Sequence, residues 1–195
     1  MRMRPEPVPT PPPTVELARC GSISAVAACW ARVGGPLPRV FAAGTQAAGR
    51  GQWGRRWRSP AGGCWFTLAL PADPPGRFPL RAAEAVRAGI EVVVGPRGAS
   101  ALEVVAPNDV LLGGRKVAGL LCERLAIPGG PERPGGPVAL IGVGVNANAA
   151  PTGADPRTGE PLRRPAASLA ELTGTRVNVR ALREACVARL LAAFA

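Results

Sequence analysis

The longest strongly apolar segments of this chain have the length of a β-strand, and this restricts the folds available to it. Val138–Val145 and Cys64–Leu70 are rich in β-branched, aromatic and other apolar residues. No apolar segment approaches the roughly 20 residues of a membrane-spanning helix. A chain of 195 residues, 47% of them hydrophobic, can bury one core, so we expect a single globular domain built on a sheet.

Four other segments are typical of helices. The predicted helices are Ile23–Val33, Leu80–Val94, Ser168–Leu172 and Val179–Phe194. The second has apolar residues at the helical period, and we expect Gly95-Pro96 to end it. Asn178 is the expected N-cap of the last helix, because its side chain can accept a hydrogen bond from a free backbone N–H group.

Runs of β-prone residues separated by turn signals complete the predicted sheet. The further strands are Val15–Cys20, Arg39–Ala43, Leu102–Val105, Asp109–Leu112 and Lys116–Arg124. Gly113-Gly114 predicts a hairpin turn, and Pro128–Pro137 and Asn146–Pro165 are expected loops. This order predicts an α+β fold with a mixed, largely antiparallel sheet and helices packed on it. We expect a flexible proline-rich tail at residues 1–14 and the folded domain at residues 15–195.

The net charge is +11, and among the 24 basic residues only Lys116 is a lysine. The arginines are spread along the chain and form no basic helix, so we expect loose association with nucleic acid and no specific DNA binding. The chain has five cysteines without a CxxC pair and no histidine, which argues against a transition-metal site. Residues 1–13 lack the apolar region of a secretory signal, so we expect a cytoplasmic protein without membrane association.

The glycine- and arginine-rich stretch 46–57 is the first of three unusual segments. Gly49, Gly51 and Gly54 match a GxGxxG pattern. A strand follows too soon for the crossover helix of a dinucleotide fold, and we reject that interpretation. Glycines let backbone N–H groups approach a phosphate, and Arg50 and Arg55 can donate fork-shaped charged hydrogen bonds. The segment is a phosphate-binding loop or, alternatively, a solvated basic loop.

The other two segments place unusual residues after a turn and in a buried strand. Lys116, which follows the turn-like Pro107-Asn108-Asp109, is the only lysine in a chain that otherwise uses arginine. A compact ammonium charge suits a small carboxylate or a phosphate. Gly142 and Gly144 interrupt a buried strand, which indicates close approach of a ligand or of another element. Asn146 ends that strand and either serves a functional site or accepts an unusual backbone angle.

Together, in this order and spacing, the three segments resemble the catalytic domain of the biotin–protein ligase family, which shares its fold with lipoate ligases and octanoyl transferases. The residues that carry the resemblance are Gly49-Arg50-Gly51-Gln52-Trp53-Gly54-Arg55, Trp57, Ser59-Pro60, Pro107-Asn108-Asp109, Arg115-Lys116, Gly119, Gly142, Gly144 and Asn146. The resemblance covers about residues 15–195. It implies an ATP-dependent ligase that forms biotinyl-5'-AMP with Mg²⁺ and transfers biotin to a lysine on the biotin carboxyl carrier domain of a carboxylase.

The resemblance also implies a role for each site residue. Lys116 and Arg50 would be catalytic, and Lys116 would bridge the carboxylate of biotin and the α-phosphate of ATP. The biotin-binding residues would be Ser22, Ser24, Gln46, Gly49, Arg50, Gly51, Gln52, Lys116 and Gly119. The nucleotide-binding residues would be Arg50, Gln52, Arg55, Trp57, Asn108, Asp109 and Asn146. Asn108 and Asp109 would also hold Mg²⁺.

Four residues in three segments depart from the family pattern. Val105-Ala106 stands where the family has Lys-Trp, Ile23 stands where it has threonine, and Gln52 stands where many relatives carry arginine. These departures leave open a lipoate or octanoate ligase or transferase of the same fold, or a non-catalytic ligand-binding relative. We expect neither the N-terminal DNA-binding module of the repressor-type ligases nor their small C-terminal β domain. The resemblance fits a monomer or a homodimer.

Overall fold

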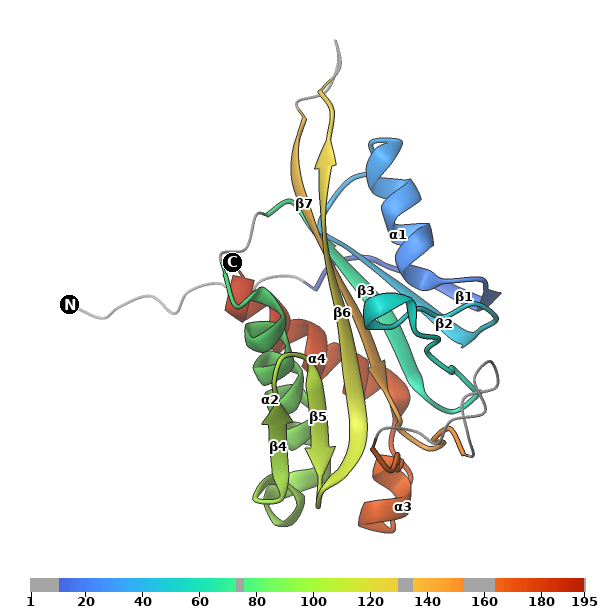
Figure 1. Cartoon of the computed structure of the whole chain (residues 1–195), viewed down its shortest axis with the longest axis vertical. Coiled ribbons are helices and arrows are strands. Elements are labelled where there is room, and N and C mark those ends of the chain that lie inside the picture. The colour runs from blue at the N-terminus through green and yellow to red at the C-terminus, as the bar shows by residue number, and fades with distance from the viewer. Residues whose placement is uncertain (1–10, 73–75, 130–134, 153–163, 195) are drawn as a thin grey trace, which may run out of the picture.

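A mixed sheet of seven strands forms the centre of the molecule (Figure 1). The structure is a computed structural model that describes residues 11–72, 76–129, 135–152 and 164–194. In spatial order the strands are β1 (Thr14–Cys20), β2 (Arg39–Gln46), β3 (Cys64–Leu70), β7 (Gly136–Val145), β6 (Arg115–Ile127), β5 (Asp109–Leu112) and β4 (Leu102–Val105). Only β1 and β2 are parallel, and every other neighbouring pair is antiparallel. The predicted α+β class with a mixed, largely antiparallel sheet is therefore confirmed.

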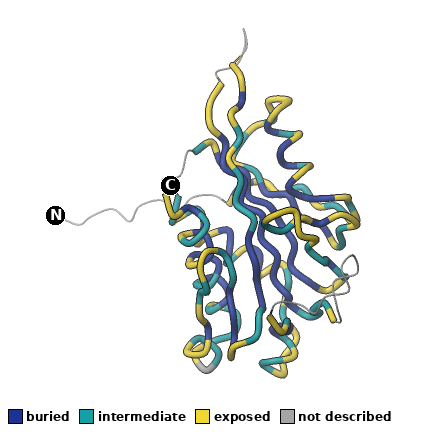
Figure 2. The backbone as a smooth tube through the Cα atoms, in the orientation of Figure 1, coloured by how far each residue is buried: buried dark blue, intermediate teal, exposed yellow. Residues whose placement is uncertain are grey.

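The helices cover both faces of this sheet. On one face lies α1 (Ile23–Arg32), and on the other lie α2 (Phe78–Ala99) and α4 (Val179–Phe194), with the short α3 (Leu169–Thr173) near one end. Strand β3 shows why both faces need cover, because all seven of its residues are buried. Alternate side chains of a strand point to opposite faces, so successive residues of β3 enter two separate apolar clusters. The central strands are buried along most of their length (Figure 2).

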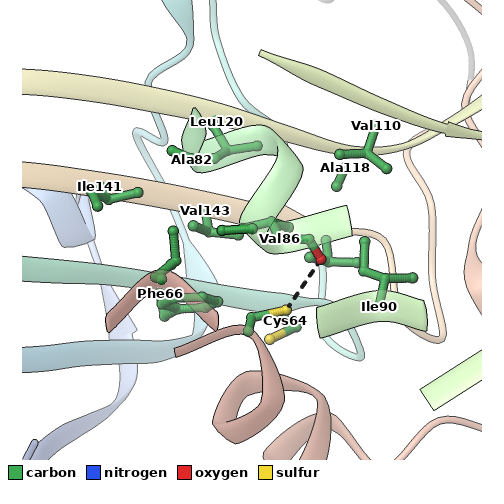
Figure 3. Packing of buried hydrophobic residues seen from close by; sticks show 14 of the residues in the cluster. Cys64, Phe66, Ala82, Val86, Ile90, Val110, Ala118, Leu120, Ile141 and Val143 are labelled. Carbon is green, nitrogen blue, oxygen red and sulfur yellow. Dashed lines mark hydrogen bonds between the residues drawn. The ribbon is translucent and has the colours of Figure 1, made fainter. Parts of the chain in front are cut away.

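The larger apolar cluster lies between the sheet and the helix pair α2 and α4. Val86 and Ile90 of α2 pack there against Phe66 and Val143 of the sheet, and each of these side chains is at most 4% exposed (Figure 3). On the α4 side, the Cys186 thiol donates a hydrogen bond to the carbonyl oxygen of Val86, with 3.9 Å between sulfur and oxygen. This cluster covers one face of the sheet, while α1 contacts β2, β3, β6 and β7 on the other.

Burial should make two of the cysteines unreactive in the folded protein. Removal from water raises the pKa of the Cys64 thiol to about 12 and raises the pKa of the Cys186 thiol well above its ordinary value. Thiols react as thiolates, so iodoacetamide at pH 8 should label exposed Cys29 in the native protein and leave Cys64 and Cys186 unlabelled. Mass spectrometry before and after denaturation checks this result. Labelling of Cys64 at the rate of Cys29 in the native protein would contradict the described core.

Most predicted elements are confirmed, and the differences concern their ends. Strand β2 continues three residues beyond Ala43 to Gln46, because Thr45 and Gln46 pair with β1. Strands β6 and β7 also lengthen, since their ladder continues to the pair Ile127 and Gly136. The end of the expected loop Pro128–Pro137 is therefore strand, and residues 130–134 of that loop lie outside the described residues.

The predicted end of the long helix is only partly correct. Gly95 does leave helical geometry, with a φ of 70°, but a further turn follows it and α2 ends at Ala99. The last helix has the predicted bounds, and the Asn178 side chain accepts a hydrogen bond from the N–H of Ala181 at 3.1 Å. Residues 1–10 of the expected tail and residues 153–163 of the expected second loop lie outside the described residues, while Thr14 already belongs to β1. No helix in the described ranges is long and apolar enough to cross a membrane.

Candidate active site

Two glycines lie side by side on the face of the sheet that carries α1. Pairing of the strands places Asp109, Gly119, Gly144 and Trp65 side by side on β5, β6, β7 and β3. The indole of Trp57 lies directly on the two glycines. A Cβ atom added to Gly144 would lie 2.4 Å from its Nε1, and one added to Gly119 would lie 2.8 Å from its Cζ3. The glycines therefore create the space in which this ring fits.

A cavity of about 850 Å³ opens above these glycines, between the sheet, the start of α1 and the loop 47–60. The side chains that line it with potential ligand-binding atoms include Ser24, Gln46, Arg50, Gln52, Arg55, Asn108, Asp109, Lys116 and Asn146. Apolar parts of the wall come from Val105, Ala106 and Leu121. A cavity of this size with a few polar groups can hold a small ligand together with a nucleotide.

The loop over the cavity is tied down at its base by hydrogen bonds. Gln46 accepts one from the N–H of Ile23 and donates one to the Ser59 hydroxyl, both at 2.8 Å. The N–H of Trp57 donates to the carbonyl oxygen of Gly49, also at 2.8 Å. These bonds join both ends of the loop to β2 and α1, so that the glycine- and arginine-rich segment is held against the cavity.

Lys116 lies at the centre of the polar groups. Its Nζ atom is 2.6 Å from Oδ1 of Asp109 and 5.3 Å from the centre of the Trp57 ring. Residues 165–167 hold its main chain. The N–H of Lys116 donates to the carbonyl oxygen of Pro165 at 2.9 Å, and its carbonyl oxygen accepts from the N–H of Ala167 at 3.1 Å. Hydrogen bonds thus hold the main chain of Lys116, and the Asp109 carboxylate holds its ammonium group.

The side-chain amide of Asn146 bonds to the main chain of Lys116, and its oxygen has no hydrogen-bond partner. Asn146 is 1% exposed, and its Nδ2 donates to the Lys116 carbonyl at 3.3 Å. Among the described residues only three buried side-chain polar atoms lack a partner, and two of them, Asn146 Oδ1 and Trp57 Nε1, belong to residues that line the cavity. An unpaired buried polar atom costs roughly 1–3 kcal/mol, so a ligand that bonds to these atoms would gain affinity.

The arginines give the cavity rim a positive charge, but Arg50 is already engaged. Its guanidinium forms an ion pair with Glu123 at 3.3 Å. Arg55 donates from Nε to the carbonyl oxygen of Gln52 at 3.1 Å. Arg50 must therefore exchange a carboxylate partner for any anion that it binds, whereas the terminal nitrogens of Arg55 need not.

The inner end of the cavity, next to α1, is small and polar. The hydroxyl groups of Ser24 and Thr67 lie 3.2 Å apart in a buried hydrogen bond. A Cβ atom on Gly142 would lie 2.9 Å from the hydroxyl oxygen of Ser24. The missing side chain at Gly142 therefore lets α1 pack closely against the sheet. Thr67 was not identified from the sequence, although a threonine inside the apolar segment Cys64–Leu70 was a usable signal.

The structure brings together most of the site residues inferred from the sequence, with two exceptions. Ser22 and Gly49 do not line the cavity, and their contact with a ligand stays a prediction. Ser22 is buried before α1, and its carbonyl accepts the N–H of Val26. A Cβ atom on Gly49 would lie 2.4 Å from the carbonyl oxygen of Trp57, so this glycine is needed for packing within the loop.

The sequence was also compared with known proteins. The model of the biotin/lipoate A/B protein ligase family matches residues 36–146. The bifunctional ligase/repressor BirA of Bacillus subtilis is 32% identical over 73% of this chain and 42% of its own length. The biotin–[acetyl-CoA-carboxylase] ligase of Paracoccus denitrificans is 37% identical over 68% of this chain and 53% of its own. This chain therefore spans about half of the length of these curated relatives.

Solved structures of biotin protein ligases share the fold. The enzyme from Aquifex aeolicus in complex with biotin and ATP aligns over 92% of this chain and 69% of its own, with a TM-score of 0.72 and 23% identity. The enzyme from Leishmania major in complex with biotinyl-5-AMP aligns over 93% of this chain and 74% of its own, with a TM-score of 0.70 and 27% identity. Since the matched family model spans more than half of the sequence, this chain belongs to the biotin/lipoate A/B protein ligase family.

Proposed function

We propose that this chain is an ATP-dependent biotin–[carboxyl carrier protein] ligase. In the first step the carboxylate of biotin attacks the α-phosphorus of ATP, which forms biotinyl-5'-AMP and releases pyrophosphate. In the second step the amine of a carrier lysine attacks the acyl carbon, AMP leaves, and the amine loses a proton. The relative from Paracoccus denitrificans supports this reaction, because its name describes a biotin–[acetyl-CoA-carboxylase] ligase, and the relative from Bacillus subtilis is also named as a ligase.

The observation that carries the proposal is the position of Lys116. A carboxylate and a phosphate repel each other, so a cation must lie between them as they react. Lys116 lines the cavity together with Asn146, whose amide oxygen is unpaired, and with the loop residues Arg50 and Arg55. In this proposal Lys116 contacts both anions, and the loop arginines bind phosphate oxygens and keep water from the mixed anhydride.

A magnesium ion fits the residues at the nucleotide end of the cavity. Mg²⁺ in nucleotide sites takes one or two side-chain oxygens and completes its shell with phosphates and water. Asp109 offers a carboxylate, of which Oδ1 lies 2.6 Å from the Lys116 ammonium, and Asn108 donates from Nδ2 to the Leu120 carbonyl at 2.6 Å, which leaves its Oδ1 as an acceptor. We assign these two residues as the metal-binding pair, and the ion would reduce the negative charge of the phosphates.

The polar inner end of the cavity favours biotin over lipoate or octanoate. The ring of biotin carries a urea group that donates and accepts hydrogen bonds, whereas octanoate and the dithiolane of lipoate have no such group. Ser24, Thr67 and Gln46 offer hydroxyl and amide groups at that end. A site built to bond polar groups discriminates strongly against a ligand that lacks them. We therefore infer that biotin occupies this end and directs its carboxylate toward Lys116.

Substrate-dependent release of pyrophosphate tests the proposed function. With ATP and Mg²⁺, biotin should stimulate pyrophosphate release and yield biotinyl-5'-AMP, while lipoate and octanoate should be at least 100-fold poorer substrates, on the order of the discrimination of a hydrogen-bonding site. Mass spectrometry of the adenylate and of a carrier domain incubated with the reaction checks both steps. Binding of biotin without any pyrophosphate release would instead identify a non-catalytic relative, and preference for lipoate would identify the other branch of the family.

The cellular context follows from the same proposal. The partner would be the biotin carboxyl carrier domain of a carboxylase, and we expect the reaction to take place in the cytoplasm with the enzyme as a monomer or homodimer. The domain assignment, residues 15–195 as one catalytic domain, belongs to the proposal as well. Gel filtration of the purified chain with and without biotin and ATP measures its oligomeric state.

A further inference from the structure

Glu123 is a carboxylate outside the cavity that holds a cation of the cavity lining. Arg50, in the loop 47–60, lines the cavity, whereas Glu123, in β6, does not. Alternate side chains of a strand point to the same face of the sheet, so Glu123 shares a face with Gly119 and Leu121, which do line it. The ion pair between Arg50 and Glu123 therefore joins the loop to the sheet at the edge of the cavity.

The main chain of Arg50 is held independently of its side chain. Arg50 forms a β-bridge with Arg56, and the N–H of Gly51 donates to the carbonyl oxygen of Arg55 at 2.7 Å. The guanidinium, in contrast, contacts Glu123 through one terminal nitrogen, Nη2, which lies 3.4 and 3.3 Å from the two carboxylate oxygens. Rotation of the side chain alone can therefore transfer the guanidinium from Glu123 to an anion in the cavity.

The ion pair is weak enough for such an exchange. The side chains of Arg50 and Glu123 are 48% and 29% exposed, and their 3.3 Å separation exceeds the 2.6 Å between Lys116 and Asp109. An exposed ion pair changes an equilibrium by only roughly two- to fivefold. A phosphate group carries more charge than a carboxylate and can accept two parallel hydrogen bonds from a guanidinium. A phosphate should therefore displace Glu123, with its affinity reduced by that modest factor.

We propose that Glu123 is a positioning residue that competes with phosphate groups for Arg50. Without a phosphate in the cavity, Glu123 holds the guanidinium at the cavity edge. When ATP binds, the guanidinium moves to the phosphates, and when pyrophosphate leaves, it returns to Glu123. The competition weakens the binding of ATP and of pyrophosphate and so favours release of this product. The inference rests on the proposed function and adds a residue that acts on the cavity from outside it.

Glu123→Gln tests the competition, because it keeps the size of the side chain and removes its charge. The Kd of a non-hydrolysable ATP analogue and the Kd of pyrophosphate should each fall roughly two- to fivefold. Calorimetric titration at low ionic strength measures both, since salt screens exposed charges. In steady-state assays the KM for ATP should fall while kcat does not rise. A purely structural role for Glu123 predicts the opposite, namely weaker binding with a lower melting temperature.

A double-mutant cycle shows whether the effect passes through Arg50. Arg50→Gln alone should raise the Kd of the ATP analogue, and adding Glu123→Gln to it should cause no comparable tightening. Glu123→Asp keeps the charge but withdraws the carboxylate by one methylene group from a contact that is already 3.3 Å long. It should also tighten binding, though less than Glu123→Gln, whereas an effect of charge alone would leave it like the parent.

Glu91→Gln provides a control with the same change in net charge. Glu91 pairs with Arg87 at 3.1 Å on α2, which covers the other face of the sheet, and it does not line the cavity. This variant should change neither Kd. Both Glu91→Gln and Glu123→Gln should melt close to the temperature of the parent, because exposed ion pairs contribute little to stability.

The possible outcomes distinguish this inference from the function on which it rests. A Glu123→Gln variant that binds the analogue and pyrophosphate no more tightly than an active parent overturns the competition alone. Tightening that persists when Arg50 is replaced, or that Glu91→Gln reproduces, would show a general effect of charge and would also overturn it. Parent protein that binds neither the analogue nor pyrophosphate contradicts the proposed function and this inference together.

Discussion

Lys116→Ala should reduce the rate of biotin-dependent pyrophosphate release by at least about a thousandfold, comparable to the loss of a principal charge-stabilising group in other enzymes. The ammonium is the cation that we place between the two reacting anions, and its contribution increases as charge develops in the transition state. The effect should therefore appear mainly in kcat, with a smaller change in KM. Stopped-flow measurement of adenylate formation separates this step from the transfer to the carrier.

Two companion variants identify what position 116 requires. Lys116→Arg keeps the charge but replaces a compact ammonium with a broad planar fork, and we expect it to remain severely impaired. Arg115→Ala removes the adjacent cation of the same strand, whose guanidinium pairs with Glu171 at 2.5 Å and does not line the cavity. Because Arg115 also donates to the Ala166 carbonyl at 2.9 Å, Arg115→Ala should lower adenylate formation, but far less than Lys116→Ala does. A Lys116→Ala variant as fast as the parent would remove the central support of the proposed mechanism.

Gly144→Ala should cause the second large loss, although alanine adds only one methyl group. That methyl would lie 2.4 Å from Nε1 and 2.5 Å from Cε2 of Trp57, closer than any real contact. The indole would have to move away from the sheet and into the cavity. Overpacking of this kind costs about 1–3 kcal/mol. We expect a lower melting temperature and a Kd for biotin at least roughly tenfold higher.

A glycine in the same strand provides a matched control. Gly136 begins β7 as Gly144 nears its end, and a Cβ atom there meets nothing within 4 Å. Gly136→Ala should leave both the melting temperature and biotin binding close to those of the parent. Equal behaviour of the two variants, by differential scanning fluorimetry and calorimetric titration, would show that contact between the Trp57 ring and the strand is unimportant.

The sequence predicted the strands and helices well because their signals are local. Gly113-Gly114 marks the β5–β6 hairpin, and Asn178 caps α4 as expected. Strand ends were less accurate, because Thr45 and Gln46 are strand only through their pairing with β1. That pairing depends on the parallel neighbour, which no local pattern in Arg39–Gln46 reveals.

The candidate site was predicted less completely, because its geometry depends on the register between neighbouring strands. The neighbouring positions of Asp109, Gly119 and Gly144 depend on how three strands align, including a shift between Val110 and Leu111. The ion pair between Arg50 and Glu123 joins residues far apart in sequence, and nothing in either segment indicates it. Trp53 was visible in the glycine- and arginine-rich segment, but its left-handed backbone, with a φ of 61°, and its 89% exposure were not.

The main-chain hydrogen bonds that hold Lys116 have a practical consequence. Pro165 and Ala167 bond to the peptide groups of this residue, and their bonds do not involve the ammonium group. Its side chain can therefore be exchanged while the surrounding backbone stays in place. A variant with an uncharged side chain at this position should retain a well-formed pocket, and it would be a suitable starting point for trapping biotin and ATP together before they react.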